Sequence, residues 1–504
     1  MNHKKKKGFS FPSAFTVLFI VLIIAAVLTY LVPAGYYERL EYVKESDEFL
    51  ITSLEKEDQL LPANQEVLDD LGVTIPLDNF QDGSIAKPVA IPGSYHEIEQ
   101  QPQGLIAVLK APIIGIADSI GIIVFILLIG GIIGILNETG AFDAGIAALS
   151  KKTKGREFLL VVIISTIIAI GGTTFGLAEE TIAFYPILMP IFIASGYDAM
   201  VAIAAIYMGS SIGTMFSTVN PFSVVIASNA AGINFNTGMG FRLISLIIAQ
   251  IITLIYIYRY AQKVKKDPSK SLIADDMPRI KEKFLHEEAN QVVPFDWRRI
   301  SMLVIFALSF VVMIWGVSSQ GWYFDEMSAL FLAVGIIMIF LSGLGEKKAV
   351  NTFLNGAADL VSVALIVGVA RGINLIMDDG LISDTLLFGA SNIIENINSV
   401  LFSSVQMLLF SILGIFIPSS SGLATLSMPI VAPLADTINI GRDVVVSAYN
   451  YGQGWMAFIT PTGLILATLE MVDVTYDKWL KFILPLMGII GVQALVMLGI
   501  QTVF

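Results

Sequence analysis

Long apolar stretches recur from one end of the chain to the other. The first runs from Phe11 to Pro33, and others cover about 112–136, 300–318 and 327–344. Because a helix rises about 1.5 Å per residue, each stretch is long enough to cross a hydrocarbon core of about 30 Å. Lipid offers backbone groups no hydrogen-bond partner, so only helices and closed barrels span it. We therefore expect an all-α polytopic membrane protein.

The composition excludes several other classes of protein. Hydrophobic residues make up 55% of the 504 residues and charged residues only 14%, whereas roughly a quarter of a soluble chain is charged. Cysteine is absent, which excludes disulfides, thiolate metal sites and cysteine nucleophiles. The three histidines, His3, His96 and His286, all lie in polar segments, and no HExxH motif occurs. We expect no enzyme, no metal centre, no cofactor and no nucleic-acid partner.

The distribution of charge predicts the orientation of the chain. Lys4 to Lys7 precede the first span, KKTKGR follows at 151–156, and residues 259–299 hold ten lysines and arginines. Basic segments of this kind stay in the cytoplasm. The four lysines are also compatible with a cleaved signal peptide, but the apolar run after them is long enough to remain as a span. We expect a multi-pass protein of a bacterial plasma membrane with a cytoplasmic N-terminus.

The polar stretch after the first span, 36–104, is strongly acidic. It contains fifteen Asp and Glu but only four basic residues, Arg39, Lys44, Lys56 and Lys87. We place it outside the cytoplasm as a small cap.

One apolar stretch does not fit a simple crossing. Between the two basic segments lie 157–194, about 199–228 and about 240–260, whereas an even number of crossings is required. The parity is restored if 157–194 enters and leaves on one side, as a re-entrant hairpin with GGTTFGLAEET at its tip. Non-helical backbone at this depth is tolerated only where protein or a watery cavity surrounds it. The tip is therefore expected to line a site.

The second half of the chain repeats the first. Glycine, proline and aspartate recur in the same order in four pairs of segments: 115–149 and 356–390, 171–178 and 417–424, 185–190 and 428–433, 195–214 and 440–459. The additional span at 327–344 reverses the direction of everything after it. The pattern predicts two inverted repeats, about nine transmembrane helices and two re-entrant hairpins, the second at about 400–435. Such a chain is typical of secondary transporters.

These features divide the chain into five segments. We expect a cytoplasmic tail with the first span, the acidic segment, the first repeat, a cytoplasmic linker and the second repeat, over 1–35, 36–104, 105–260, 261–299 and 300–504.

Several motifs also resemble a known family. FPSAFTVLFIVLIIAAVLTYLVPAG, GGTTFGLAEETIAFYPIL, GAADLVSVALIVGVARGINLIMDDGLISDT and IPSSSGLA are similar to the YfcC family. That family is grouped with the anaerobic C4-dicarboxylate carriers and includes arginine/ornithine antiporters. The resemblance implies the ion-transporter superfamily architecture, with a scaffold domain, a transport domain holding two opposed hairpins, and often an elevator mechanism. We expect a small-molecule substrate, contact with the lipid bilayer and a homodimer.

Three charged residues lie where charge is costly. Glu179 and Glu180 occupy the first hairpin tip, and Arg371 lies inside an apolar stretch. Each glutamate either binds a substrate or coupling ion, or caps free amides at the tip. Arg371 either binds a substrate carboxylate or forms a structural ion pair with Asp359 or one of the glutamates.

Polar and small residues around the tips complete the predicted site. Their alternative role is helix packing. For substrate we expect Thr173, Thr174, Glu179, Glu180, Asn220, Arg371, Asn374, Ser419, Ser420, Ser421, Asn450, Gln453, Thr460 and Thr462. For a coupling ion, Na⁺ or H⁺, we expect Gly209, Ser210, Ser211, Thr214 and Thr218.

The charges favour one substrate class. One arginine and two glutamates suit an α-amino acid with a cationic side chain better than a dicarboxylate, which requires more cations. We expect an arginine/ornithine-type antiporter with alternating access. The alternatives are a transporter of C4-dicarboxylates or other carboxylates coupled to Na⁺ or H⁺ and, less favoured, a channel.

The predicted orientation is tested by cysteine labelling in intact cells. Cysteines replacing Lys152 and Lys283 should react only with reagents that reach the cytoplasm, and one replacing Gln81 should react only from outside. Labelling of the Gln81 position from the cytoplasm contradicts the orientation.

Overall fold

The computed structural model describes residues 12–85, 87–142, 144–145, 156–285, 294–320, 322–395 and 399–503. It is mostly helical, and the predicted polytopic architecture is confirmed. The basic residues of the N-terminal tail and Lys152 lie outside the described residues.

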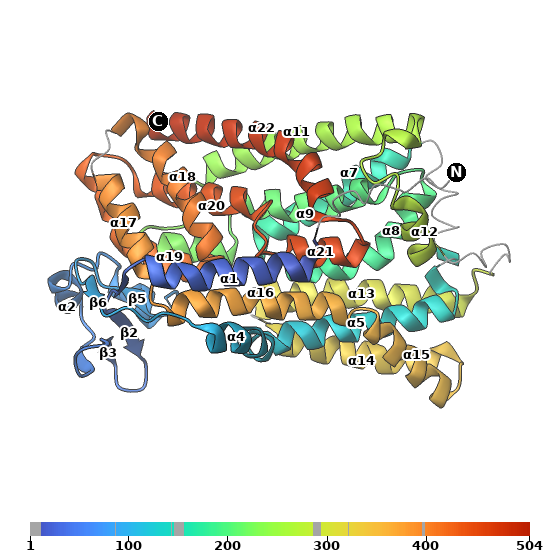
Figure 1. Cartoon of the computed structure of the whole chain (residues 1–504), viewed down its shortest axis with the longest axis horizontal. Coiled ribbons are helices and arrows are strands. Elements are labelled where there is room, and N and C mark those ends of the chain that lie inside the picture. Colours follow the sequence, from blue (N-terminus) through green and yellow to red (C-terminus); the bar gives the residue numbers. More distant parts are fainter. Residues whose placement is uncertain are drawn as a thin grey trace, which may run out of the picture.

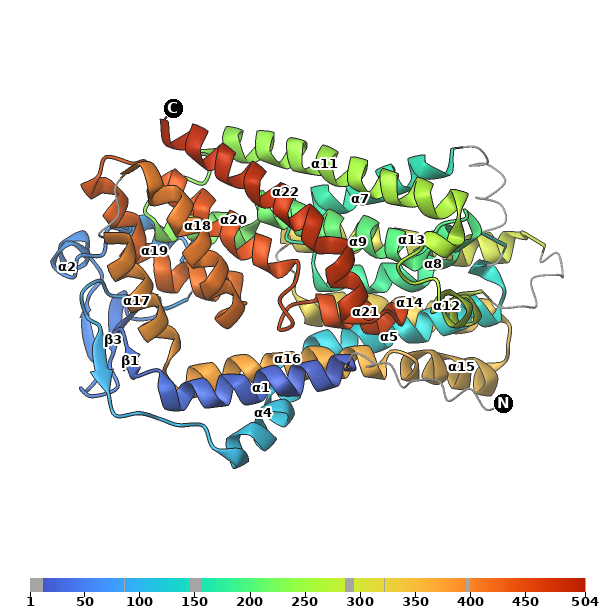
Figure 2. The same ribbon diagram turned by 45° about the horizontal axis from the view of Figure 1, so that its top comes forward.

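Helices long and apolar enough to cross a membrane run along the molecule. Within the described ranges there are eight: α1 (Ala14–Leu31), α5 (Ile120–Glu138), α7 (Glu157–Thr174), α11 (Met239–Lys266), α13 (Trp297–Gln320), α14 (Phe324–Ser342), α16 (Val361–Asp379) and α22 (Tyr476–Val503). Figure 2 shows α1 and α16 side by side on one side of the molecule, and α11 and α22 side by side on the other.

The second predicted span consists of two helices, α4 (Leu105–Asp118) and α5, which meet at Ser119. The equivalent place in the second half is also broken, because α15 (Glu346–Ala358) ends just before α16. The α4–α5 and α15–α16 pairs pack against each other through glycines. A Cβ on Gly115 would lie 2.3 Å from the carbonyl oxygen of Gly368, and one on Gly134 would lie 2.8 Å from that of Thr352.

This packing gives the direction of the two pairs. Contacts of Gly115 with Gly368 and of Gly134 with Thr352 mean that one pair runs antiparallel to the other. Opposite directions for equivalent elements support the inverted repeat, which stays a prediction, as do the five segment boundaries.

Both predicted hairpins contain a break at their tip. In the first, α7 is followed by the 3₁₀ turn η1 (Glu179–Phe184) and α8 (Tyr185–Ala194); in the second, α18 (Ser399–Phe416) is followed by α19 (Ser420–Thr437). The re-entrant path of both hairpins stays a prediction.

A broken helix follows each hairpin. In the first half it consists of α9 (Ala199–Met215), the π turn η2 (Pro221–Val225) and α10 (Ile226–Ala230). In the second half it consists of α20 (Arg442–Ala457) and α21 (Ile465–Val472). The first arm of each hairpin packs closely on the following helix, α7 on α9 and α18 on α20.

The acidic segment departs from the all-α expectation. It contains a four-stranded antiparallel sheet in the order β4-β3-β2-β5 and a separate β1–β6 pair. The strands are β1 (Ala34–Tyr36), β2 (Arg39–Val43), β3 (Glu48–Thr52), β4 (Gln59–Pro62), β5 (Val89–Ala90) and β6 (His96–Ile98), with short helices α2 (Gln65–Asp70) and α3 (Leu77–Gln81). We call this unit the cap.

The cap is joined firmly to the helices beside it. Its buried core, which includes Leu40 and Phe49, forms one apolar cluster with residues of α10, α17 (Ser383–Glu395), α19 and α20. Arg39 forms an ion pair of 2.7 Å with Asp384, at the start of α17. The cap therefore has a fixed position against the second hairpin.

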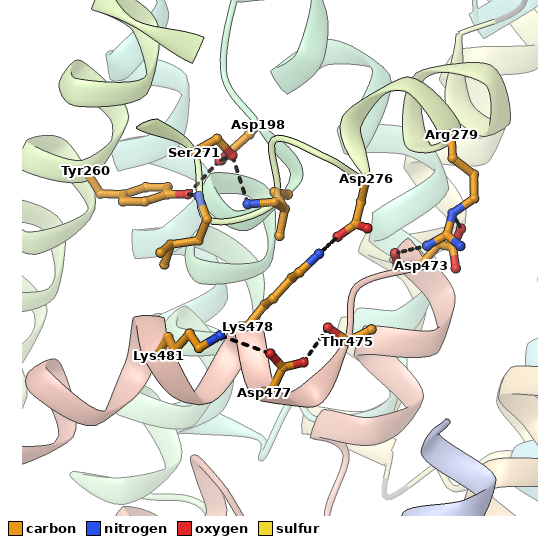
Figure 3. A network of polar contacts seen from close by, with 12 residues as sticks. Asp198, Tyr260, Ser271, Asp276, Arg279, Asp473, Thr475, Asp477, Lys478 and Lys481 are labelled. Atoms are coloured by element: carbon orange, nitrogen blue, oxygen red, sulfur yellow. Dashed lines mark hydrogen bonds and ion pairs between the residues drawn. The ribbon is translucent and has the colours of Figure 1, made fainter. Parts of the chain in front are cut away.

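The basic linker lies at the opposite end of the molecule from the cap (Figure 1). It forms η3 (Pro268–Lys270) and α12 (Met277–Phe284). Figure 3 shows its contacts: Asp276 pairs with Lys478 of α22, and Ser271 and Tyr260 donate to Asp198 at 2.6 and 2.7 Å. These contacts tie the linker to both halves of the chain.

Candidate functional site

The broken helices that follow the two hairpins contact each other. The Nδ2 atom of Asn450, on α20, donates to the Oγ of Ser217, just beyond α9, at 2.7 Å. Beside this contact the rings of Phe216 and Tyr451 are 4.6 Å apart. Residues more than 230 positions apart in the sequence are thus brought to one place.

Most predicted site residues at the first tip pair with backbone groups that the helix break leaves free. Asn220 donates to the carbonyl of Gly172 at 3.0 Å, and Thr218 donates its amide to Thr173 Oγ1 at 2.9 Å. Ser210 donates to the carbonyl of Leu177. These side chains are buried, so their first role is to satisfy the broken backbone.

The second tip is built in a similar way. Gln453 donates to the carbonyl of Pro418 at 3.3 Å, and Tyr449 donates to that of Ser420 at 2.6 Å. Ser419 caps α19 by accepting from the amide of Gly422 at 3.2 Å. A direct substrate contact by Gln453 or by the predicted tip serines stays a prediction.

The remaining predicted residues are divided between tip, loop and helix positions. Thr174, at the end of α7, donates to the carbonyl of Ile170 at 2.6 Å, and Thr460, after α20, donates to that of Met456 at 2.9 Å. Two others keep a buried oxygen without a hydrogen-bond partner among the described residues: Thr462 Oγ1, in the same loop, and Asn374 Oδ1, on α16.

The predicted ion-coupling residues occupy α9 and the turn after it. Gly209 faces α7, where an added Cβ would lie 2.8 Å from the carbonyl oxygen of Ser165, so the structure gives it a packing role. Ser211 and Thr214 are half-buried on the same helix. Among the described residues, no cluster of three His, Cys, Asp or Glu is arranged to hold a metal ion. A coupling-ion site stays a prediction.

The two glutamates have different surroundings. Glu180 accepts a hydrogen bond from the amide of Ala178 at 3.1 Å, so it takes the capping role that was one of the two alternatives. Both side chains are half-buried. Within the described ranges, neither Glu179 nor Glu180 forms an ion pair with a lysine or arginine. Of the two tip carboxylates, Glu179 therefore has more of its hydrogen-bonding and ion-pairing capacity free to bind a ligand.

Arg371 pairs with a residue that the sequence did not indicate. Its Nε lies 2.5 Å from Oδ2 of Asp118, at the α4–α5 break. The expectation that Arg371 pairs with Asp359 or with a glutamate of the tip is therefore wrong. Asp118 is the repeat equivalent of Asp359, and only the folded chain shows which of the two faces Arg371. The side chains of Arg371 and Asp118 are 39% and 44% exposed, so this pair is accessible to water.

Tyr323 lies between α13 and α14, and the centroid of its ring is 6.5 Å from that of Phe222, at the start of η2. Burial raises the pKa of its hydroxyl, the charges of Glu179 and Glu180 raise it further, and the charge of Arg371 lowers it. Charges of both signs therefore lie within electrostatic range of one tyrosine. No pattern in the sequence indicates a functional role for Tyr323, because a tyrosine at the end of a span is commonly an interfacial residue.

Helices of membrane-spanning length around two broken hairpins are the architecture of a secondary membrane transporter. The chain belongs to the family of C4-dicarboxylate anaerobic carriers, which it matches over residues 11–503. It is thus a multi-pass membrane transporter of small molecules and not an enzyme.

Two relatives cover almost the whole chain. An uncharacterised protein of Haemophilus influenzae is 47% identical over 99% of this chain and 98% of its own length. A protein of Escherichia coli, described as the putative basic amino acid antiporter YfcC, is 30% identical over the same shares. The expected resemblance to the YfcC family is confirmed.

Two solved structures also align over nearly the full length. They are MtrF of Neisseria gonorrhoeae, described within a class of antimetabolite efflux pumps, and the YdaH transporter of Alcanivorax borkumensis. MtrF is 15% identical with a TM-score of 0.38, covering 98% of this chain and 96% of its own. YdaH is 12% identical with a TM-score of 0.39, covering 97% and 98%.

Substitution of Tyr449 by phenylalanine tests the structural role of the polar residues at the tips. The substitution removes the hydrogen bond from the buried Tyr449 hydroxyl to the carbonyl of Ser420, and a bond of this kind contributes about 0.5–1.5 kcal/mol to stability. We expect a lower melting temperature for the purified protein in detergent. The matched control is Tyr258→Phe, an exposed position on α11. Equal melting temperatures for the two variants would show that the tip does not depend on this hydrogen bond.

Proposed function

We propose that this transporter exchanges basic amino acids of the arginine or ornithine type by alternating access. The carrying observation is that Arg371 of α16 has only the half-exposed Asp118 as an ion-pair partner, whereas Glu179 and Glu180 of the first hairpin form no ion pair among the described residues. A basic amino acid has a carboxylate and two positive groups, which match these charges.

Arg371 is suited to bind the α-carboxylate of the substrate. Its planar guanidinium offers two parallel donors to a carboxylate. The present partner, Asp118, is similarly exposed, and exposed ion pairs contribute only about 0–1 kcal/mol. A substrate carboxylate can therefore compete with Asp118 for Arg371 at little cost. Asn374, one turn further along α16, has a side-chain oxygen without a hydrogen-bond partner among the described residues, and this oxygen can accept from the substrate ammonium group.

The glutamates provide the complementary charge. Placing carboxylates in a poorly solvated tip is costly unless a cation compensates them, and the described residues contain no ion-pair partner for Glu179. The substrate's positive groups supply this compensation. The Escherichia coli relative described as a putative basic amino acid antiporter supports the same substrate class.

The alternative is a transporter of C4-dicarboxylates or other carboxylates. The family's description as C4-dicarboxylate carriers favours it, but two further carboxylates near Glu179 and Glu180 would be repelled unless Na⁺ or H⁺ were bound too. As further parts of the proposal, the protein lies in a bacterial plasma membrane with a cytoplasmic N-terminus and forms a homodimer.

Arginine/ornithine counterflow in liposomes tests the proposal. Loss of one partner of a buried charge pair costs about 2–5 kcal/mol, and each 1.4 kcal/mol is about tenfold. We therefore expect Glu179→Gln to raise the KM for arginine more than tenfold. Arg371→Gln should also raise it, with less effect on inhibition by decarboxylated arginine. The matched control is Glu138→Gln, which removes an ion pair with Lys348 at the C-terminal end of α5.

Three results separate the candidates. Saturable exchange that requires substrate on the opposite face excludes a channel. Normal arginine exchange by both Glu179→Gln and Glu180→Gln would make the glutamates structural caps. Exchange of succinate without exchange of arginine would replace the proposal by the dicarboxylate alternative.

A further inference from the structure

A cavity of 620 Å³ lies where α11 and α20 begin and α22 ends. Its lining includes Gly238 and Gly240 at the start of α11, Asp443 of α20 and Gln501 of α22. Figure 1 shows the C-terminus and the cap at the same end of the molecule. Because α11 and α22 are long and apolar enough to cross a membrane, a cavity at their ends lies at the boundary between membrane and water.

Two side chains of this cavity have hydrogen-bond acceptors that the protein leaves unused. Gln501 is only 4% exposed, and its Nε2 donates to Oδ2 of Asp443 at 2.8 Å. Its Oε1 has no hydrogen-bond partner among the described residues. Within the same ranges Asp443 forms no ion pair. Since an unpaired buried acceptor is costly, this arrangement indicates that a donor binds here.

Two glycines hold the carboxylate of Asp443 at the wall of the cavity. A Cβ on Gly441 would lie 2.4 Å from Oδ1, and one on Gly238 would lie 2.7 Å from Oδ2. Gly238 also has a φ of +73°, which residues with a Cβ rarely adopt. The backbone therefore approaches both carboxylate oxygens as closely as glycine allows, and it fixes their position.

The arginines nearest in the sequence do not neutralise Asp443. Arg442 pairs with Asp436, and the fully buried Arg242 donates to two backbone carbonyls of the loop before α11. Asp443 also lies in the first turn of α20, where a carboxylate stabilises the helix dipole. That structural role is the alternative to ligand binding, and a test has to separate the two.

The cavity contacts lipid as well as water. Ile244 and Val503 belong to its lining and are 51% and 80% exposed, and exposed apolar side chains on membrane-spanning helices face lipid. The first turn of α11 lines the same cavity, and its N-cap, Gly238, provides no side-chain hydrogen bond. The free amides and the dipole of this 28-residue helix favour a phosphate. Acceptors for a cation and donors for a phosphate thus lie in one lipid-facing cavity.

We propose that this cavity binds the headgroup of an aminophospholipid such as phosphatidylethanolamine. The primary ammonium group donates to Asp443 and to Oε1 of Gln501, and the phosphate lies at the first turn of α11. The methylated ammonium of phosphatidylcholine has no N–H to donate, and the headgroup of phosphatidylglycerol has no positive charge. The bound lipid joins α11 and α22 to α20, the helix that carries Asn450. This site is independent of the identity of the transported substrate.

The test is native mass spectrometry of the purified full-length protein titrated with phosphatidylethanolamine, phosphatidylcholine or phosphatidylglycerol. A hydrogen bond to a charged group should give the wild type a Kd for phosphatidylethanolamine roughly tenfold below that for the other two lipids. Asp443→Asn should abolish this preference, and Gln501→Leu should reduce it. The matched control is Asp325→Asn, because Asp325 is the second residue of α14 just as Asp443 is the second residue of α20. This control should keep the preference.

Four results would overturn the proposal. Equal affinities of the wild type for phosphatidylethanolamine and phosphatidylcholine would show that the ammonium N–H groups are not recognised. A full preference in both Asp443→Asn and Gln501→Leu would place the lipid elsewhere. Loss of the preference in Asp325→Asn as well would assign the effect to helix dipoles. Binding of free arginine that Asp443→Asn abolishes, without binding of any of the lipids, would assign the cavity to a soluble amine.

Discussion

Helix breaks inside an apolar bundle leave backbone carbonyls without partners, and every such group has to be paired within the protein. This requirement determines which side chains stand at the two hairpins. Asn220 pairs with Gly172, Gln453 pairs with Pro418, and Tyr207 donates to the carbonyl of Ala457 at 2.7 Å. Because each pair joins different helices, the hairpins and the broken helices hold one another in place.

The charged groups that these pairings do not use define what the site can bind. Glu179 at the first hairpin has no ion-pair partner among the described residues, and Arg371 has only an exposed one. A site with separated positive and negative ends selects a substrate with the same separation, and this selection underlies the proposed exchange of basic amino acids. The polar uncharged residues that pair with the broken backbone hold the hairpin tips in shape.

Much of this arrangement is predictable from the sequence, because apolar length, glycine and proline mark spans and breaks. The repeat also aligned Asp118 with Asp359, at the two places where the helices break. Sequence patterns do not identify contacts between residues that lie far apart in the chain. The cap's β1–β6 pair joins residues about 60 positions apart, Ala34 with Ile98, through strands too short to show a periodic pattern. Arg371 and Asp118 are separated by 253 positions, and a single sequence does not show which acidic residue faces an arginine.

An electron cryo-microscopy map of the purified protein with bound arginine tests the central claim most directly. The account predicts density for one arginine beside Tyr323, with its carboxylate at Arg371 and its positive groups toward Glu179. Density for arginine elsewhere, such as in the 620 Å³ cavity lined by Gly238 and Asp443, with the region around Tyr323 empty, would contradict it.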